Sequence, residues 1–208
     1  MPRKTKAEAE ATREAILDAA EFEFYERGVG CTSLEKIACA AGVTRGAIYW
    51  HFRNKQDLFD AMLCRVSNPM VARLEALCEN HGSINGLRDI CIYSLSQLAE
   101  NEHHFRVFSI LFHRSESDTG MEIQGNLARQ AIEKLTLYFH QSHNSDVLNP
   151  GISPELAANA LQSYFSGLYY EYLGDPGRWN LKQDARTLVD LILRGICKPA
   201  NLLIQETT

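Results

Sequence analysis

The chain has 208 residues, of which 45% are hydrophobic and 23% are charged, and its formal net charge is −5. This composition is ordinary for a soluble globular protein with one large domain or two small ones, and no apolar run approaches the roughly 20 residues needed to span a membrane. The N-terminal stretch MPRKTKAEAEATREAI has no apolar core, so we expect no secretory signal, no membrane partner, a cytoplasmic location and reduced cysteine thiols.

Apolar residues recur at helical spacing along the whole chain and no alternating strand pattern is found, which predicts an all-α protein. In the first segment Ile16, Ala20 and Phe24 repeat every four residues, and Gly28 stands where a helix favours a left-handed residue after its last turn. Residues that suit an N-cap precede the next three helices. The four N-terminal helices are predicted at about 9–27, 33–41 with N-cap Ser33, 44–51 with N-cap Thr44, and 54–79 with N-cap Asn54 and a kink or break at Pro69.

A turn at 80–83 separates these helices from five mostly longer ones, and proline and glycine clusters separate the last three of the five. The later helices are predicted at about 86–102, 104–114, 121–143, 153–173 and 180–198. The sequence therefore predicts about nine helices.

The segment GVTRGAIYWHF, residues 42–52, contains a turn and the third predicted helix. It follows the second helix directly, so the second and third helices form a candidate helix-turn-helix. Ile48 and Phe52 lie four residues apart and share the inward face. Tyr49 and Trp50 are rotated by about 100° and 200° from Ile48, so at least one of these rings faces outward. A buried aromatic cluster is the alternative, but many small and polar residues share the outward arc, which favours a binding surface.

The outward arc has the chemistry of a surface that reads the major groove of DNA. Small residues let a helix lie deep in the groove, an arginine can bond guanine through two N–H groups, and apolar atoms can contact thymine methyl groups. The net charge does not argue against DNA, because residues 1–65 hold ten basic and ten acidic residues and the remainder of the chain carries the whole excess. Lys55 begins the fourth helix, where the helix dipole also favours an anion.

Residues 10–70 resemble the DNA-binding domain of the TetR family of bacterial transcriptional regulators, and the stretches RKTK, AAGVTRGAIYWHF and NKQDLF resemble its AcrR-like subgroup of multidrug efflux repressors. The resemblance implies a three-helix domain with its helix-turn-helix at about 33–52, followed by a ligand-binding and dimerisation domain at 71–208. It also implies a homodimer that binds a palindromic operator in double-stranded DNA, represses an efflux operon and is released by a hydrophobic small molecule. The residues that match the family's DNA contacts are Ser33, Thr44, Arg45, Gly46, Ala47, Tyr49, Trp50, His51 and Lys55.

The second domain is rich in aromatic residues, and helix bundles can enclose cavities lined by aromatic groups and a few polar ones. The resemblance places a hydrophobic effector in such a cavity, although plain core packing would also explain any single aromatic residue. The candidate ligand-binding residues are Phe112, His113, Glu116, Tyr138, Gln162, Phe165 and Tyr169.

The last two long helices are the candidate dimer interface. Small residues such as Ser163 and Gly167 would allow another helix to approach closely, and a dimer would place two recognition helices one DNA turn apart. A face buried inside the protomer would show the same pattern, so both interpretations remain open. The candidate interface residues are Leu161, Leu168, Leu188, Ile192 and Ile196.

The N-terminal Arg3, Lys4 and Lys6 are interpreted either as an arm that reaches DNA or as a solvated terminus. The pairs Cys78/His81 and His140/His143 have the spacing of metal ligands, but neither has a second pair to complete a tetrahedral site. We therefore expect no metal and no cofactor. No nucleophile elbow, phosphate loop or carboxylate pair indicates an enzyme.

Two alternatives to an efflux repressor stay open from the sequence. A regulator of the same family could control metabolism or quorum signalling instead of efflux. A helical ligand-binding or enzymatic protein without a DNA role is the alternative from another class.

Overall fold

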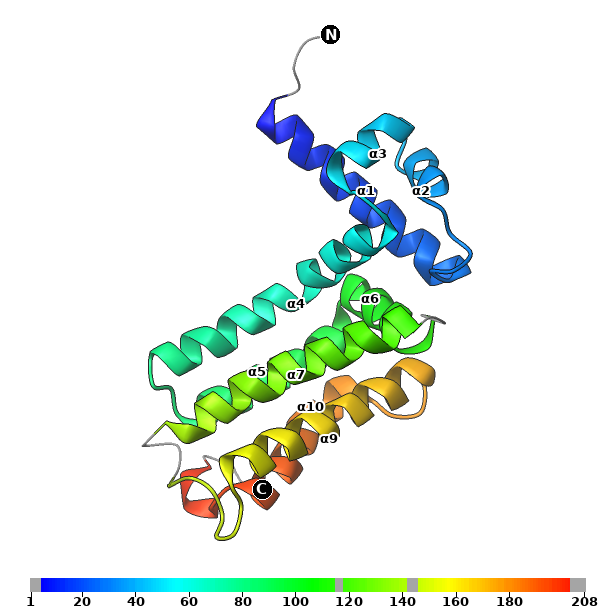
Figure 1. The fold of residues 1–208 in the computed structure, drawn as a ribbon. Coiled ribbons are helices and arrows are strands. Elements are labelled where there is room, and N and C mark those ends of the chain that lie inside the picture. Colours follow the sequence, from blue (N-terminus) through cyan, green and yellow to red (C-terminus); the bar gives the residue numbers. More distant parts are fainter. Residues whose placement is uncertain (1–4, 115–117, 142–145, 203–208) are drawn as a thin grey trace.

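The computed structural model describes residues 5–114, 118–141 and 146–202 (Figure 1). The described residues form nine α-helices, a short 3-10 helix and no strand, which confirms the predicted all-α class. The helices are α1 (Lys6–Arg27), α2 (Leu34–Ala40), α3 (Arg45–His51), α4 (Lys55–Glu79), α5 (Ile84–Glu100), α6 (Glu102–His113), α7 (Asp118–His140), α9 (Pro154–Gly174) and α10 (Leu181–Ile196).

Side-chain caps set the beginnings of the N-terminal helices. Ser33, Thr44 and Asn54 each accept a backbone N–H from the first turn of the helix that follows, as predicted. Helix α1 begins three residues before the predicted start at 9, because Thr5 and Glu8 form a reciprocal capping box. The acidic side chain three residues after the threonine was the signal for this earlier start.

Helix α4 runs unbroken through Pro69, so of the predicted kink or break at this residue the break is wrong. A proline inside a helix removes one backbone donor, and here the carbonyl of Arg65 loses its usual partner four residues later. The helix continues because apolar side chains on both sides of the proline, among them Leu63 and Leu74, are buried against other helices. Packing thus compensates for the lost hydrogen bond.

The helices bury two apolar cores that meet along α4 and α6. The first core joins α1, α2, α3 and the start of α4 to residues of α6 such as Val107 and Ile110. The second core contains Leu74 of α4 and the buried faces of α5, α7, α9 and α10. Figure 1 shows α4 running from the small N-terminal group of helices along the larger group, so this helix belongs to both parts of the molecule.

The domain boundary predicted at residue 70 therefore falls inside a continuous helix. None of the described helices has both the length and the apolar content needed to cross a bilayer.

Candidate DNA interface and effector cavity

Helices α2 and α3 form a helix-turn-helix whose turn depends on Gly42. This glycine has φ +66°, which a residue with a side chain rarely adopts. The N–H of Val43 donates to the carbonyl of Ala38 at 2.9 Å and closes the turn. Ile48 is fully buried and Phe52 is 2% exposed, so these two side chains hold α3 against the domain, as predicted.

The aromatic residues between these anchors face solvent. Tyr49 is 43% exposed and Trp50 is 73% exposed, so both rings point outward. The Trp50 ring stands edge-on to the His51 ring, with 4.5 Å between their centroids. Thr44, Arg45 and Gly46 are exposed as well, whereas Ala47 and His51 are partly buried. Most of the residues at 44–51 that resemble the family's DNA contacts therefore lie on an open surface at α3, and Ser33 is exposed at the start of α2.

An acidic side chain lies beside this surface. Oε1 of Glu35, in the first turn of α2, is 3.2 Å from Nη2 of Arg45 and accepts a hydrogen bond from the Tyr49 hydroxyl at 3.4 Å. No sequence signal distinguished Glu35, because a carboxylate in the first turn of a helix is ordinary.

Lys55 is bound within the protein rather than extended toward solvent. Its Nζ donates to the carbonyl of Val29 at 2.7 Å and to that of Thr32 at 3.2 Å. The ammonium group has a third N–H, which leaves one donor for a phosphate. The main role of Lys55 in the structure is therefore to bind the beginning of α4 to the loop between α1 and α2.

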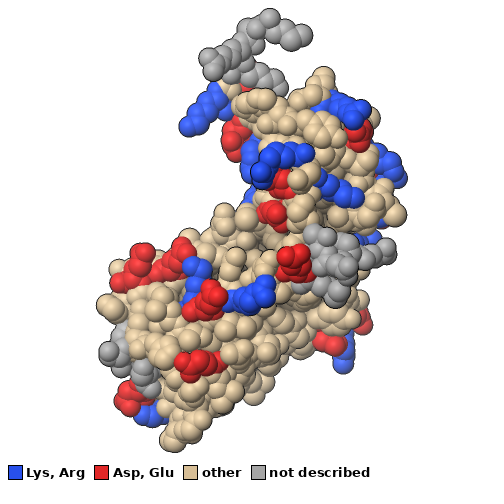
Figure 2. All heavy atoms as spheres, in the orientation of Figure 1, with Lys and Arg blue, Asp and Glu red and all other residues tan. Residues whose placement is uncertain are grey.

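Basic and acidic side chains are distributed differently over the two parts of the chain. Figure 2 shows Lys and Arg gathered over the N-terminal helices and acidic groups prominent over the larger helical part on this face. This distribution agrees with the division of charge between residues 1–65 and the rest of the sequence.

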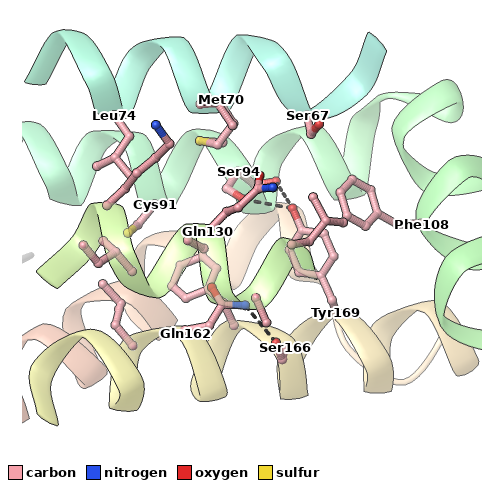
Figure 3. Close-up of a pocket in the computed structure, with 18 of the residues that line it drawn as sticks. Ser67, Met70, Leu74, Cys91, Ser94, Phe108, Gln130, Gln162, Ser166 and Tyr169 are labelled. Atoms are coloured by element: carbon pink, nitrogen blue, oxygen red, sulfur yellow. Dashed lines mark hydrogen bonds between the residues drawn. The ribbon is translucent and has the colours of Figure 1, made fainter. Parts of the chain in front are cut away.

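A cavity of about 230 Å³ lies among α4, α5, α6, α7 and α9 (Figure 3). Its wall is mostly apolar. Four of the predicted ligand-binding residues line it: Phe112, Gln162, Phe165 and Tyr169. Other lining residues were not predicted, among them Ser67, Met70, Leu74, Cys91, Ser94, His104, Phe108, Gln124, Gln130 and Lys134.

Two predicted ligand-binding residues do not line the cavity. His113 is exposed, and its Nε2 lies 3.0 Å from the carbonyl oxygen of Tyr170. Tyr138 is fully buried beside Phe139 in the second core. His113 follows Phe112 by one residue, so it is turned by about 100° from the face that meets the cavity. The third residue, Glu116, lies outside the described residues.

A hydrogen-bonded polar group in the wall of the cavity joins α5, α6 and α9. Nε2 of His104 and the hydroxyl of Tyr169 are 3.0 Å apart, and the Tyr169 hydroxyl is 2.8 Å from Oγ of Ser94. Burial lowers the pKa of His104 to about 4, so its ring is neutral at pH 7. His104, Phe108 and Phe112 follow each other at four-residue spacing, which was the available sequence signal for His104.

The residue before His104 belongs to an ion network between the two parts of the molecule. Glu21 of α1 is 2% exposed and accepts hydrogen bonds from Arg65 of α4 at 2.9 Å and from Arg106 of α6 at 2.7 Å. Nδ1 of His103 lies 2.9 Å from the same carboxylate. Three helices thus share one buried acid, which is also near Asp18, whose carboxylate accepts a bond from Arg65 at 2.7 Å.

These groups have the composition of a cation site, since ligand atoms of Asp18, Glu21 and His103 lie within 4.8 Å of one another. The arginines already bind both carboxylates, so the network is satisfied by the protein's own cations. The metal-ligand spacing at Cys78 and His81 joins no such cluster among the described residues, and His143 of the second pair lies outside them.

A second cavity of about 280 Å³ lies beside this network. Its wall is more polar than that of the first cavity and comes from α1, α4, α5 and α6, with Asp18, Arg65 and His103 among its residues. Met70 and His104 line both cavities, so only these two side chains are common to the two walls. The apolar cavity and the cavity beside the ion network therefore adjoin at Met70 and His104.

The structure corrects most of the predicted dimer interface. Leu161, Leu168 and Ile196 are at most 6% exposed and belong to the second core of the protomer. Leu188 and Ile192 are partly buried against the same core. Helical spacing identified a covered face, but that face packs against helices of the same protomer.

The large apolar side chains that α9 and α10 leave open are different ones. Leu156, Tyr170 and Leu191 are 55%, 53% and 61% exposed. The small residues Ser163 and Gly167 are also exposed on α9. An apolar and small-residue face thus remains uncovered on the last two long helices.

Of the predicted basic arm, Arg3 and Lys4 lie outside the described residues, whereas Lys6 is the first residue of α1. All six cysteines are free, with Cys31, Cys39 and Cys64 exposed. Burial raises the pKa of the Cys91 thiol to about 12, which keeps it protonated and unreactive at the cavity wall.

Comparison with family models matches both parts of the chain. Residues 16–62 match the model described as bacterial regulatory proteins of the tetR family. Residues 83–197 match the C-terminal region of MAATS-type transcriptional repressors. The first match covers the helix-turn-helix, and the second covers the helices that enclose most of the apolar cavity.

Known proteins of similar sequence and structure span nearly the whole chain. The transcriptional regulator AcrR of Shigella flexneri is 36% identical over 202 residues, which is 93% of each chain. NalD, the secondary repressor of the MexAB-OprM multidrug efflux pump in Pseudomonas aeruginosa, is 36% identical with a TM-score of 0.81, covering 93% of this chain and all of that one. A complex of SmeT with triclosan is 30% identical with a TM-score of 0.85, covering 95% and 97% of the two chains.

Proposed function

The chain belongs to the TetR family of bacterial regulatory proteins, and on that premise we propose that it is a cytoplasmic, dimeric repressor of a multidrug efflux operon. A hydrophobic small molecule releases it from its operator. The observation that carries the proposal is the course of α4. This helix begins shortly after α3, the proposed recognition helix, and lines the apolar cavity with Ser67, Met70 and Leu74.

The DNA-binding role is assigned to the open surface of α3. Arg45 and the exposed rings of Tyr49 and Trp50 can reach base edges and sugars in a major groove, while Thr44 and His51 can meet phosphates. The relatives support this assignment, because AcrR and NalD are described as a transcriptional regulator and a repressor.

The effector role is assigned to the apolar cavity. Its wall favours aromatic and aliphatic compounds, and the few polar groups that line it, such as Gln162 and Tyr169, would orient a ligand. SmeT, a repressor of similar fold, has been solved with triclosan, a compound of this class. SmeT and NalD are both described as repressors of multidrug efflux pumps, which supports a transporter operon as the target here.

An effector acts only if it binds the DNA-incompetent arrangement better than the competent one. A ligand in the cavity contacts α4 directly and His104 of α6, and both helices also hold Glu21 of α1 through Arg65 and Arg106. We infer that ligand binding pivots α4 and α1 together. The two recognition helices of a dimer would then leave the spacing of about 34–36 Å that one DNA turn requires.

The partner for the dimer is a second copy of the chain, bound through the open face of α9 and α10. Leu156, Tyr170 and Leu191 supply apolar area, and Ser163 and Gly167 allow close helix approach. This face replaces the one predicted from the sequence.

A gel-shift assay with the DNA upstream of the protein's own gene tests the proposal. We expect a specific complex on that fragment, a much weaker one on random DNA, and loss of the specific complex when triclosan or another planar hydrophobic compound is added. A variant with Phe112→Trp, which fills the cavity, should bind DNA but respond poorly to the compound. Equal binding to both DNAs, or full operator affinity in a saturated ligand complex, would contradict the proposal.

A further inference from the structure

Glu35, Arg45 and Tyr49 form a closed cluster between α2 and α3. The Glu35 carboxylate is 3.2 Å from the Arg45 guanidinium and accepts the Tyr49 hydroxyl at 3.4 Å. The guanidinium carbon of Arg45 is 5.7 Å from the centre of the Tyr49 ring. Each member therefore contacts the other two, and two of the three are proposed DNA contacts.

The cluster contributes little to the fold. The side chains of Arg45 and Glu35 are 72% and 45% exposed, and an ion pair this open to solvent adds little to stability. The neighbouring anchors Ile48 and Phe52 hold α3 without it. A reason for Glu35 should thus be sought in what it does to Arg45.

A carboxylate beside an arginine disfavours phosphate binding by that arginine. The backbone N–H of Glu35, the Ser33 hydroxyl and then the charge of Arg45 hold the pKa of Glu35 below its ordinary value, so the carboxylate is ionised at neutral pH. A phosphate that approaches Arg45 is repelled by this charge and must also compete with Glu35 for the guanidinium. Base edges carry no net charge and meet only the competition.

We propose that Glu35 is a specificity-determining residue that positions Arg45 for a base and disfavours its use on phosphates. A guanidinium has five N–H donors in a planar fork, so one edge can stay on Glu35 while another faces the groove. The same carboxylate accepts the hydrogen bond of the Tyr49 hydroxyl, so the Tyr49 ring and the Arg45 guanidinium are held in fixed positions relative to each other. The inference rests on the proposed DNA-binding function.

The test compares Glu35→Gln with Glu26→Gln on the upstream fragment and on random DNA. Both substitutions remove one negative charge from an exposed residue of the N-terminal helices, but only Glu35 contacts α3. For Glu35→Gln we expect binding to random DNA to strengthen about fivefold. The preference for the upstream fragment over random DNA should fall by about fivefold or more, because Arg45 loses the partner that positions it for a base. Glu26→Gln should change both affinities by less than about twofold.

A second measurement separates positioning from general charge. In an Arg45→Ala background, Glu35→Gln should strengthen random-DNA binding no more than Glu26→Gln does, because its effect acts through Arg45. The same result for Glu35→Gln with and without Arg45 would overturn the inference, as would equal effects of Glu35→Gln and Glu26→Gln. If the wild-type protein does not prefer the upstream fragment, the proposed function fails instead.

Discussion

At the residue scale, single side chains do work that their position in the sequence does not reveal. Lys55 looks like a free phosphate ligand at a helix start, yet its ammonium group bonds two carbonyls of the loop between α1 and α2. His104 looks like one of several histidines near a helix start, yet it is 5% exposed and borders both cavities.

Lys55→Ala should therefore change both stability and DNA binding. Loss of the ammonium group leaves two backbone carbonyls without their donor, so the free energy of unfolding should fall by about 1–2 kcal/mol. The affinity of Lys55→Ala should fall by the same factor on operator and random DNA, and the dependence of log affinity on log salt should have a slope smaller by about one. Arg45→Ala should instead reduce the binding free energy by about 1–3 kcal/mol through one base position of the operator. Urea unfolding and salt-dependent gel shifts measure these effects. Equal specificity profiles for the two variants would contradict this division.

The buried ring of His104 should make the protein less stable in mild acid. Its pKa is about 4 in the folded protein and about 6.5 in the unfolded chain, so between these values only the unfolded chain binds the proton. Stability is complete above pH 6.5 and is lost as the pH falls toward 4, by about 2 kcal/mol between pH 7 and pH 5. Urea unfolding at both pH values should show a drop smaller by this amount for His104→Gln. An unchanged drop in the variant would contradict the burial effect.

At the scale of the element, α4 combines two requirements in one helix. Its N-terminal half packs with α1 and α6 through residues such as Leu58 and Met62, and its C-terminal half lines the cavity. Pro69 lies between the halves and removes the backbone bond to the carbonyl of Arg65. The helix is thus least constrained next to the arginine that holds Glu21.

Pro69→Ala should stabilise the protein and reduce its response to effectors. The alanine restores the missing N–H, and after allowance for the looser unfolded chain the gain should be about 1–2 kcal/mol. A stiffer α4 should also require more effector to release DNA. Urea unfolding and effector titrations of the gel shift measure both quantities, with the exposed neighbour change Asn68→Ala as control. The prediction is wrong if the two variants respond alike.

At the scale of the whole molecule, the two parts are joined by buried apolar contacts and by one ion network. Val107, Ile110 and Leu111 of α6 belong to the core of the N-terminal helices. Glu21 adds a polar link from α1 to both α4 and α6. The buried acid can pair with its two arginines only when the three helices keep their present arrangement.

Glu21→Gln should loosen this junction. Removal of the charge leaves Arg65 and Arg106 without a shared buried partner, and a loss of about 3 kcal/mol of stability is expected. Glu14→Gln is the matched control, because Glu14 pairs with the same Arg65 but its side chain is 43% exposed and should cost less than about 1 kcal/mol. Urea unfolding compares the two. Equal losses would show that burial of Glu21 adds nothing to the pairing.

The sequence by itself determined the helices, the helix-turn-helix and its caps, because these follow from local features. Periodicity, Gly42 and the capping residues Ser33, Thr44 and Asn54 act over a few neighbouring positions. The same local logic identified Ile48 as an anchor and placed at least one of Tyr49 and Trp50 outside, where the structure has both. Family resemblance then extended these features to a DNA-binding role.

Only the tertiary structure decided which covered face meets which neighbour. Periodicity shows that Leu161 and Ile196 are covered, but a helix of the same protomer and a second protomer cover a face equally well. In the same way, His104 lines the cavity and His113 does not, because the composition of the wall depends on how five helices converge. The pairing of Glu21 with Arg65 and Arg106 joins residues 44 and 85 positions apart, and no local pattern encodes such a contact.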